Sequence, residues 1–357
     1  MPHINSNALI FAIRTPPTPT YVFDTYWRFA TERQAVYFRR FTDRTGPWTN
    51  DPIISSHRFT NAYRASDRVS QYLIGDVIYS GDFDARNTVL RILLFKLFNK
   101  IETWELLEEK AGVLDAASFN VSKLNSILTD AMQAGERIYS AAYIMPSALR
   151  IGESTYKHKT HLDLLAAVLR DGIMERILTA KSFQELFFVL RGLPGIGPFL
   201  AYQYAIDLTY SEYFNFSEDD FVQPGPGALH GLMKCFSSLG DYTPAETIEW
   251  VKDRQDAEFE RLGLKFPSLW GRPLHLIDCQ NLFCETDKYA RVAHPEFSEM
   301  TGRTRIKQRF SPKGELKAPR FPPKWKIDVK SSQQNAETNI ISGDQVESFR
   351  GQQELRF

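Results

Sequence analysis

The sequence is poor in cysteine and lacks any long apolar run. Its 357 residues contain three cysteines, Cys235, Cys279 and Cys284, too few for a disulfide framework and without neighbouring zinc ligands. No stretch approaches the ~18 consecutive apolar residues that a membrane-spanning helix needs. The first residues lack the basic segment and apolar core of a secretory signal. These absences predict an intracellular protein without a membrane partner, cytoplasmic in a prokaryote or nuclear in a eukaryote.

Metal-ligand spacing is also missing. The seven histidines form no H-E-x-x-H or similar pattern, so we expect no metal site. We likewise expect no cofactor. The sequence gives no indication of a protein partner.

Charge is balanced overall but uneven along the chain. Lys and Arg number 43, as do Asp and Glu, yet residues 301–330 hold ten Lys or Arg against two acids. A basic arm on a mildly acidic body is a common arrangement in nucleic-acid-binding proteins. We therefore predict that Arg303, Arg305 and Lys307 contact a DNA backbone. The alternative is a basic segment that only aids solubility.

Apolar residues recur mainly at helical spacing, which predicts an all-α protein. Helices are expected at residues 24–42, 66–78, 84–99, 102–111, 120–136, 162–178, 182–191 and 199–210, and one weak strand at 138–144. We divide the chain into an irregular lead-in (1–20), an N-terminal helical part (21–150), a second helical part (151–300), the basic extended arm (301–330) and a disordered tail (331–357).

A glycine-rich turn, LPGIGP at residues 193–198, separates two helical patterns. Gly195 and Gly197 permit a tight turn, and Pro198 suits the first position of the following helix. The free amides of such a helix start can bind a DNA phosphate, or the turn can be a simple helix connection. Main-chain carbonyls of this hairpin could also share a structural monovalent cation with the phosphate. A second helix start at Gly225–Pro226, followed by Gly227, joins the predicted backbone contacts.

Two polar clusters are candidates for chemistry and base recognition. Asp278, Asn281, Glu285 and Lys288 share one helix face and, with Gln280, predict the wall of a polar pocket; a surface ion-pair ladder is the alternative.

Asn61, Tyr63, Arg64 and Asp67 lie near aromatic residues that could stack on an extruded base. Burial of these aromatic residues in a helical core is the alternative. In either case the two clusters are expected to lie in the helical body.

The hairpin resembles that of the helix-hairpin-helix DNA glycosylase superfamily, and residues 159–236 follow the order of elements in that superfamily's core. Over residues 21–325 the chain also resembles the helical domain associated with 5-hydroxymethyluracil DNA kinases. The resemblance rests on PWTNDP at 47–52, RFTNAYR at 58–64 with Asp67, and IDCQNLFCE at 277–285. It implies a helix-hairpin-helix glycosylase-like body that acts on modified pyrimidines in DNA.

The sequence departs from these families at three places. Gln223 or Gly225 stands where the glycosylase superfamily has its catalytic Asp, and Asp220 lies three residues before Gln223. Phe199 replaces the Lys that forms a Schiff base in bifunctional members, so a glycosylase of this sequence would be monofunctional. The G-x-x-x-x-G-K-[ST] loop of the kinases is not found in these residues.

The leading prediction is a monofunctional glycosylase that flips and excises a hydroxymethyl- or glycosyl-pyrimidine from double-stranded DNA, with defence against phage DNA as one role. Asp278, Glu285 and Asp220 are its catalytic candidates. Base contacts are predicted for Asn61, Tyr63, Arg64, Asp67, Gln280, Asn281, Lys288 and Gln223. One alternative is a transferase that elaborates a phosphorylated hydroxymethyl-pyrimidine, and another is a module that binds modified DNA without altering it.

Overall fold

The computed structural model describes residues 14–43, 45–141, 156–298, 302–312 and 316–329. Almost all regular structure in these ranges is helical, which confirms the all-α prediction. Of the helices described there, none is both long and apolar enough to span a bilayer. The tail predicted to be disordered, 331–357, lies outside the described residues, as does the predicted boundary at 150 and 151.

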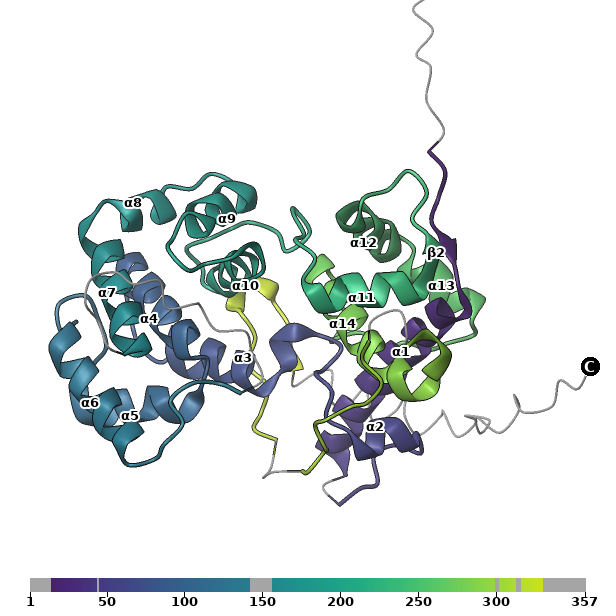
Figure 1. Ribbon diagram of the computed structural model, residues 1–357, viewed down its shortest axis with the longest axis horizontal. Helices are drawn as coiled ribbons and strands as arrows, with labels where there is room; N and C mark the ends of the chain where they lie inside the picture. Colours follow the sequence, from purple (N-terminus) through teal and green to yellow (C-terminus); the bar gives the residue numbers. More distant parts are fainter. Residues whose placement is uncertain (1–13, 44, 142–155, 299–301, 313–315, 330–357) are drawn as a thin grey trace, which may run out of the picture.

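One half of the molecule is built around α4 and stands on the left of Figure 1. Most of α4 is buried, and it contacts α7, α8 and α10. The half consists of α3 (Arg68–Tyr72), η2 (Leu73–Ile78), α4 (Ala85–Phe98), α5 (Ile101–Ala111), α6 (Val121–Gln133), α7 (Lys157–Arg170), α8 (Ile173–Leu178), α9 (Phe183–Arg191) and α10 (Pro198–Thr209).

The other half is built around α14, which packs against α1, α2, α11 and α12. The packing of α11 on α14 is close, since a Cβ added at Gly231 would lie 2.1 Å from the carbonyl oxygen of Phe283. The half consists of β1 (Thr18–Pro19), α1 (Tyr21–Thr42), α2 (Pro52–Ser56), η1 (Arg64–Ser66), α11 (Pro226–Cys235), β2 (Phe236–Ser238), α12 (Pro244–Asp253), α13 (Gln255–Arg261), α14 (Leu276–Ala293) and η3 (Pro295–Phe297).

The last described segment runs back across both halves. It includes η5 (Pro323–Trp325), drawn in yellow beside α10 in Figure 1. The Lys324 ammonium donates to the carbonyls of Ser211 and Phe214, at 3.0 and 2.6 Å. The Trp325 ring lies 5.8 Å from the Tyr210 ring and 3.7 Å from the guanidinium carbon of Arg272. This part of the basic arm is therefore docked on the body.

Several predicted elements differ in detail. The helix expected at 162–178 is two helices, α7 and α8, because Gly172 adopts a positive φ of 73° between them. The one expected at 66–78 is three short pieces, of which η2 is a π-helix. Helix α1 begins one residue after Thr20, whose hydroxyl accepts from the amide of Val22, so it starts earlier than residue 24.

The strand expected at 138–144 is absent from 138–141, and the rest of it lies outside the described residues. Instead β1, within the predicted lead-in, pairs antiparallel with β2, with Thr18 opposite Ser238. This two-stranded sheet fastens the start of α1 to the end of α11. The sheet joins residues more than 200 positions apart, a pairing that alternation within either short segment does not reveal.

Candidate functional site

The hairpin at residues 193–198 joins α9 to α10. It is an exposed turn that two buried apolar side chains anchor to the core. Leu193 and Ile196 are buried, and the amide of Ile196 donates to the carbonyl of Leu193 at 3.1 Å. Gly195 has a φ of 77°, which glycine adopts without strain. Gly197 precedes α10 and Pro198 opens it, with no side chain capping the helix. The first-turn amides are therefore left for solvent or a ligand.

A second uncapped helix start lies against the hairpin. Helix α11 follows Gly225 and opens with Pro226, as expected from the sequence. A Cβ added at Gly225 would lie 2.5 Å from the Phe199 ring, and one at Gly227 would lie 3.0 Å from the Cys284 sulfur. Gly225 thus allows the first turns of α10 and α11 to approach each other, and Gly227 allows α11 to approach α14. The predicted cation at the hairpin stays a prediction; one carbonyl there, that of Ile196, accepts from the Arg191 guanidinium at 3.0 Å.

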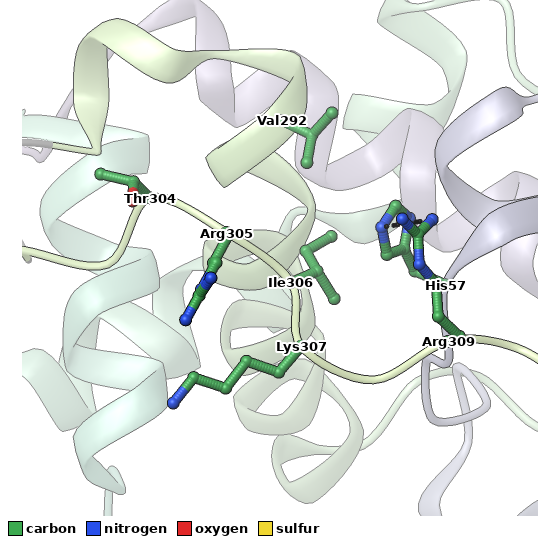
Figure 2. A pocket seen from close by; sticks show the side chains of 7 residues that line it. All are labelled: His57, Val292, Thr304, Arg305, Ile306, Lys307 and Arg309. Atoms are coloured by element: carbon green, nitrogen blue, oxygen red, sulfur yellow. Dashed lines mark hydrogen bonds between the residues drawn. The ribbon is translucent and has the colours of Figure 1, made fainter.

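The predicted backbone contacts of the arm lie elsewhere. Arg303, Arg305 and Lys307 are exposed, and Arg305 and Lys307 line a cavity together with His57 in the half built around α14 (Figure 2). They are not part of the hairpin.

The two polar clusters predicted separately meet along α14. The amide of Arg64 donates to one oxygen of Asp278 at 2.8 Å, and the amide of Thr60 donates to Glu285 at 3.1 Å. The Lys288 ammonium lies 2.6 Å from Glu285 and 4.7 Å from the centre of the Phe59 ring. The segment 60–64 therefore runs over the predicted polar stripe and covers much of it.

Asp278 is buried, and both of its oxygens are engaged. Besides Arg64, it accepts from the amide of His275 at 3.1 Å, across the first turn of α14. Burial, followed by the nearby charge of Glu218, raises the pKa of Asp278 to about 7. The Asp278 carboxyl group therefore gains or loses its proton near neutral pH, but its two oxygens are bound by backbone amides.

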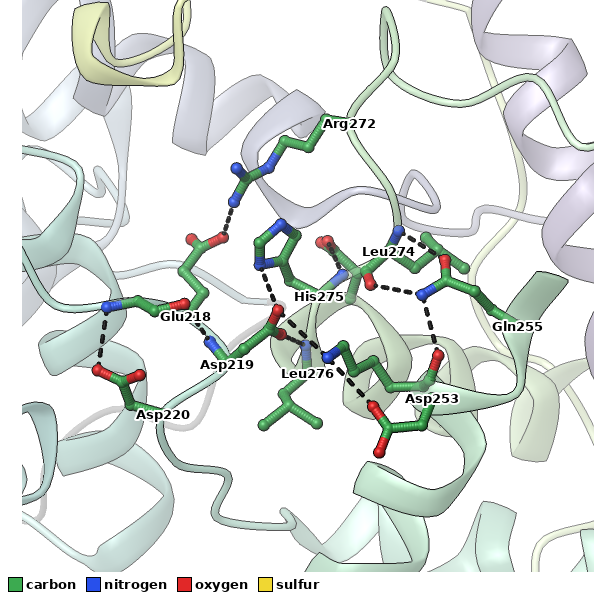
Figure 3. Close-up of polar contacts among 12 residues, drawn as sticks. Glu218, Asp219, Asp220, Asp253, Gln255, Arg272, Leu274, His275 and Leu276 are labelled. Atoms are coloured by element: carbon green, nitrogen blue, oxygen red, sulfur yellow. Dashed lines mark hydrogen bonds and ion pairs between the residues drawn. The ribbon is translucent and has the colours of Figure 1, made fainter.

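Further polar residues interact near the start of α14, and Figure 3 shows Glu218, Asp219, Arg272 and His275 among them. Glu218 forms an ion pair with Arg272 at 2.6 Å, and Asp219 lies 3.1 Å from His275 and accepts from the amide of Leu276 at 2.9 Å. Asp220, the predicted catalyst, is instead exposed and accepts from the amide of Ser217 at 3.1 Å. Asp219 and Glu218, rather than Asp220, therefore reach the α14 cluster.

Arg64 links the two halves from a buried position. Its guanidinium lies 2.7 Å from Asp207, 3.0 Å from Gln203 and 2.8 Å from the Tyr210 hydroxyl, all in or just after α10. The ammonium of Lys96 lies 3.0 Å from the same Asp207. Sequence reasoning missed Lys96 and Asp207. Single charged residues inside strongly apolar helices are a usable signal, because such residues are rarely buried without partners.

Several of the residues predicted to contact a base are hydrogen-bonded within the protein. Tyr63 is buried and donates to the carbonyl of Arg272 at 2.5 Å. Asn61 donates from its side chain to the carbonyl of Ser66, and its amide donates to Asp67 at 2.8 Å. Gln280 accepts from Gln203 at 3.4 Å. These residues hold the site together, and their contact with a base stays a prediction.

Two predicted residues keep their amides available. Gln223 lies just before α11 and Asn281 lies on α14, and both are half-buried. Within the described ranges neither side chain has a hydrogen-bonded partner. They are the members of the predicted base-binding set best placed to bond with a ligand.

The fold and the site define an all-helical protein with an exposed hairpin turn and a polar site along its last long helix. The sequence model of the family described as "5-hmdU DNA kinase, helical domain" matches residues 20–299, and the chain belongs to that family. A 5-hmdU DNA kinase of Bacillus phage SP10 is 25% identical over 296 residues, which cover 77% of this chain and 46% of that relative. The chain thus spans less than half the length of this relative.

These comparisons correct the functional prediction. The family and the relative are named for a kinase, which is a transferase, so the predictions of a glycosylase and of a hydrolase are wrong. They favour the transferase alternative instead. No solved structure matches the chain, and the link to the helix-hairpin-helix superfamily stays a prediction.

Proposed function

We propose that this chain binds DNA and takes part in group transfer at the 5-hydroxymethyl group of a pyrimidine, with the base remaining attached. The family match over residues 20–299, which covers the body from α1 to α14, carries this proposal. The acceptor is the hydroxymethyl group or its phosphorylated form. Because the chain matches less than half of the phage kinase, phosphoryl transfer itself is part of what must be tested.

The hairpin is the site where we propose that the DNA backbone binds. The uncapped first turns of α10 and α11 present free amides and the positive ends of two helix dipoles. Phosphate contacts of this kind position a duplex without reading its sequence. We propose double-stranded DNA as the substrate, which places the activity in the cytoplasm of a prokaryote or the nucleus of a eukaryote.

Glu285 is the best candidate for the proton acceptor of the reaction. A hydroxyl that attacks a donor must lose its proton, and a positioned carboxylate can accept it. One Glu285 oxygen accepts from the amide of Thr60 and pairs with Lys288, and within the described part of the chain the other oxygen has no hydrogen-bond partner. Asp278 has both oxygens occupied by amides, and Asp220 closes a surface turn. We therefore favour Glu285 over these two carboxylates.

The test compares duplexes containing thymine, 5-hydroxymethyluracil or its phosphorylated form. The full chain is incubated with each duplex and with ATP, or with small amine and alcohol nucleophiles for the phosphorylated form. The DNA is then digested to nucleosides and weighed by mass spectrometry. With 5-hydroxymethyluracil and ATP we expect the mass of a phosphoryl group to be added. With the phosphorylated form we expect the nucleophile to replace the phosphate, which leaves as inorganic phosphate. No bases are lost in either case. Abasic sites, or unchanged nucleosides with every donor, would contradict the proposal.

Three variants and one control locate the reaction. Glu285→Gln should lower the rate at least about 100-fold, in the range of a lost general base, with little change in DNA affinity. Glu109→Gln is the control, because Glu109 is exposed on α5 in the other half. Asn281→Ala and Gln223→Ala should reduce the preference for modified over plain DNA. An unchanged rate in Glu285→Gln would remove Glu285 from this role.

A further inference from the structure

The arm carries cations at every second position. Residues 303–309 read Arg-Thr-Arg-Ile-Lys-Gln-Arg, and side chains two apart in an extended segment point the same way. The segment is extended here: the amide of Arg58 donates to the carbonyl of Gln308, and the amide of Phe310 donates to that of Ser56, both at 3.1 Å. Ile306 is buried, while Arg305 and Lys307 are exposed. The cations therefore share an outward face anchored to the chain near α2.

These side chains line a cavity of about 450 Å³ (Figure 2). Its walls are formed by His57, Val292, Thr304, Arg305, Ile306, Lys307 and Arg309. Among the described residues that line it there is no Asp or Glu. The cavity lies beside the end of α14, in a different half from the hairpin.

The cations of this cavity differ from several others on the surface, which pair with carboxylates. Arg86 pairs with Glu175 and Arg320 with Asp76, at 2.9 and 3.1 Å. Within the described ranges, no carboxylate forms an ion pair with Arg305, Lys307 or Arg309. Like charges held close together without counter-charges repel each other and create a field that attracts an anion.

His57 positions one of these cations. Its Nδ1 lies 3.1 Å from the carbonyl oxygen of Ile53, so this nitrogen carries the proton and donates. Its Nε2, left as an acceptor, lies 3.5 Å from the guanidinium of Arg309. Arg309 is thereby held beside His57 at the cavity, while its remaining N–H groups stay available.

We infer that the face formed by Arg305, Lys307 and Arg309, with His57 as the positioning residue, binds the phosphates of a DNA backbone. Cations at alternate positions of an extended segment lie about 6.8 Å apart, which is about two steps of the 3.4 Å rise per nucleotide in duplex DNA. Such a row suits a regular polyanion better than a single phosphate. This inference rests on the proposed DNA-directed function and adds a second backbone site to the hairpin.

The test measures how salt weakens binding. The full chain and the triple variant Arg305→Gln/Lys307→Gln/Arg309→Gln are titrated with a labelled plain duplex between about 50 and 200 mM salt. Each lost phosphate contact lowers the slope of log affinity against log salt by about 0.9, so we expect a decrease of about 3. The control Lys110→Gln/Arg170→Gln/Arg176→Gln removes the same charge from exposed sites in the other half. An equal slope in the two triple variants would overturn the inference.

Three further measurements separate the alternatives. The variant Arg305→Lys/Arg309→Lys, with Lys307 unchanged, should keep most of the salt slope, because counterion release requires only a charge. ATP or inorganic phosphate added at constant ionic strength should compete weakly with DNA; strong competition that the triple variant abolishes would make the cavity a nucleotide or phosphate site and overturn the DNA assignment. The preference for hydroxymethylated over plain duplex is measured in parallel and should be the same in the triple variant. If the parent protein shows no preference for hydroxymethylated duplex, the result contradicts the proposed function but not the inference about the arm.

Discussion

Single buried charges join segments of this protein that are distant in sequence. Asp278 holds the amides of Arg64 and His275, and Arg64 in turn holds Asp207 on α10. The pKa of Asp278 is raised from 3.8 to about 7 by burial, so its carboxyl binds a proton more readily in the folded chain than in the unfolded one. The contribution of Asp278 to the unfolding free energy therefore falls as the pH rises from 3.8 to about 7.

Asp278→Asn should flatten this pH dependence. Between about pH 4 and 7, titration of Asp278 lowers the unfolding free energy of the parent by up to about 1.4 kcal/mol per pH unit. The Asn side chain of the variant does not titrate, so this decrease should be missing. The variant should also be less stable at pH 5, by about 1–3 kcal/mol, because its NH₂ group faces an amide donor. Urea unfolding at several pH values measures both effects. Asp220→Asn, at an exposed turn, is the control; a parent-like slope in Asp278→Asn would contradict the assignment.

Arg64 and Arg320 provide a matched comparison of buried and exposed pairs. Both pair with an aspartate, but Arg64 and Asp207 are almost fully buried, whereas Arg320 is 54% exposed. Arg64→Met leaves Asp207 with Lys96 alone and should cost about 3–5 kcal/mol of unfolding free energy. Arg320→Met should cost less than about 1 kcal/mol. Chemical denaturation gives both values, and similar losses would show that the Arg64 network adds little to stability.

At the scale of elements, α11 and α14 approach closely because glycines face the partner helix. Gly231→Ala would place a methyl group 2.1 Å from a backbone oxygen of α14, which can move only with its helix. We expect a loss of about 1–3 kcal/mol or more from such overpacking. Gly227→Ala meets the Cys284 sulfur at 3.0 Å, the end of a side chain that can rotate, and should be much milder. Thermal unfolding compares the two; equal effects would mean that the helices separate easily.

Helices and turns were predictable where local signals were strong. Helix α4 was expected at 84–99 and runs from Ala85 to Phe98, because Asp84 caps it and Asn99 ends it in a left-handed conformation. The helix start at Pro226 was read from Gly225 and Pro226 themselves. The partners of Asp278 were not predictable, since Arg64 lies 214 residues away and contributes a main-chain amide. Any residue type supplies such an amide, so no sequence pattern marks it.

The Arg64–Lys96–Asp207 network illustrates the same limit within the site. Lys96 and Asp207 each lie alone in an apolar stretch, which indicates that each has a partner but does not identify it. The partners come from η1, α4 and α10, and only the packing of these elements brings them together. The hairpin, by contrast, is contained in six consecutive residues, and its positive φ and buried Leu193 and Ile196 followed from their identities.

At the scale of the whole molecule, the docked end of the arm connects the two halves. Residue Arg320 pairs with Asp76 at 3.1 Å, Lys324 binds the carbonyls that follow α10, and Trp325 lies on Arg272 before α14. The segment is held by a few cation and ring contacts rather than by a long helix. Its removal should therefore loosen the junction without unfolding either half.

Trp325→Ala tests this connection. Loss of the ring removes its contacts with Tyr210 and Arg272, so the turn after α10 and the segment before α14 should open more often. Hydrogen exchange followed by mass spectrometry should show faster exchange at residues 211–216 and 269–275, and little change in α4. Trp48→Ala, which removes a ring from the loop beside α2, is the control and should leave both segments unchanged. Unaltered exchange in Trp325→Ala would mean that Arg64 and its partners hold the two halves together without help from the arm.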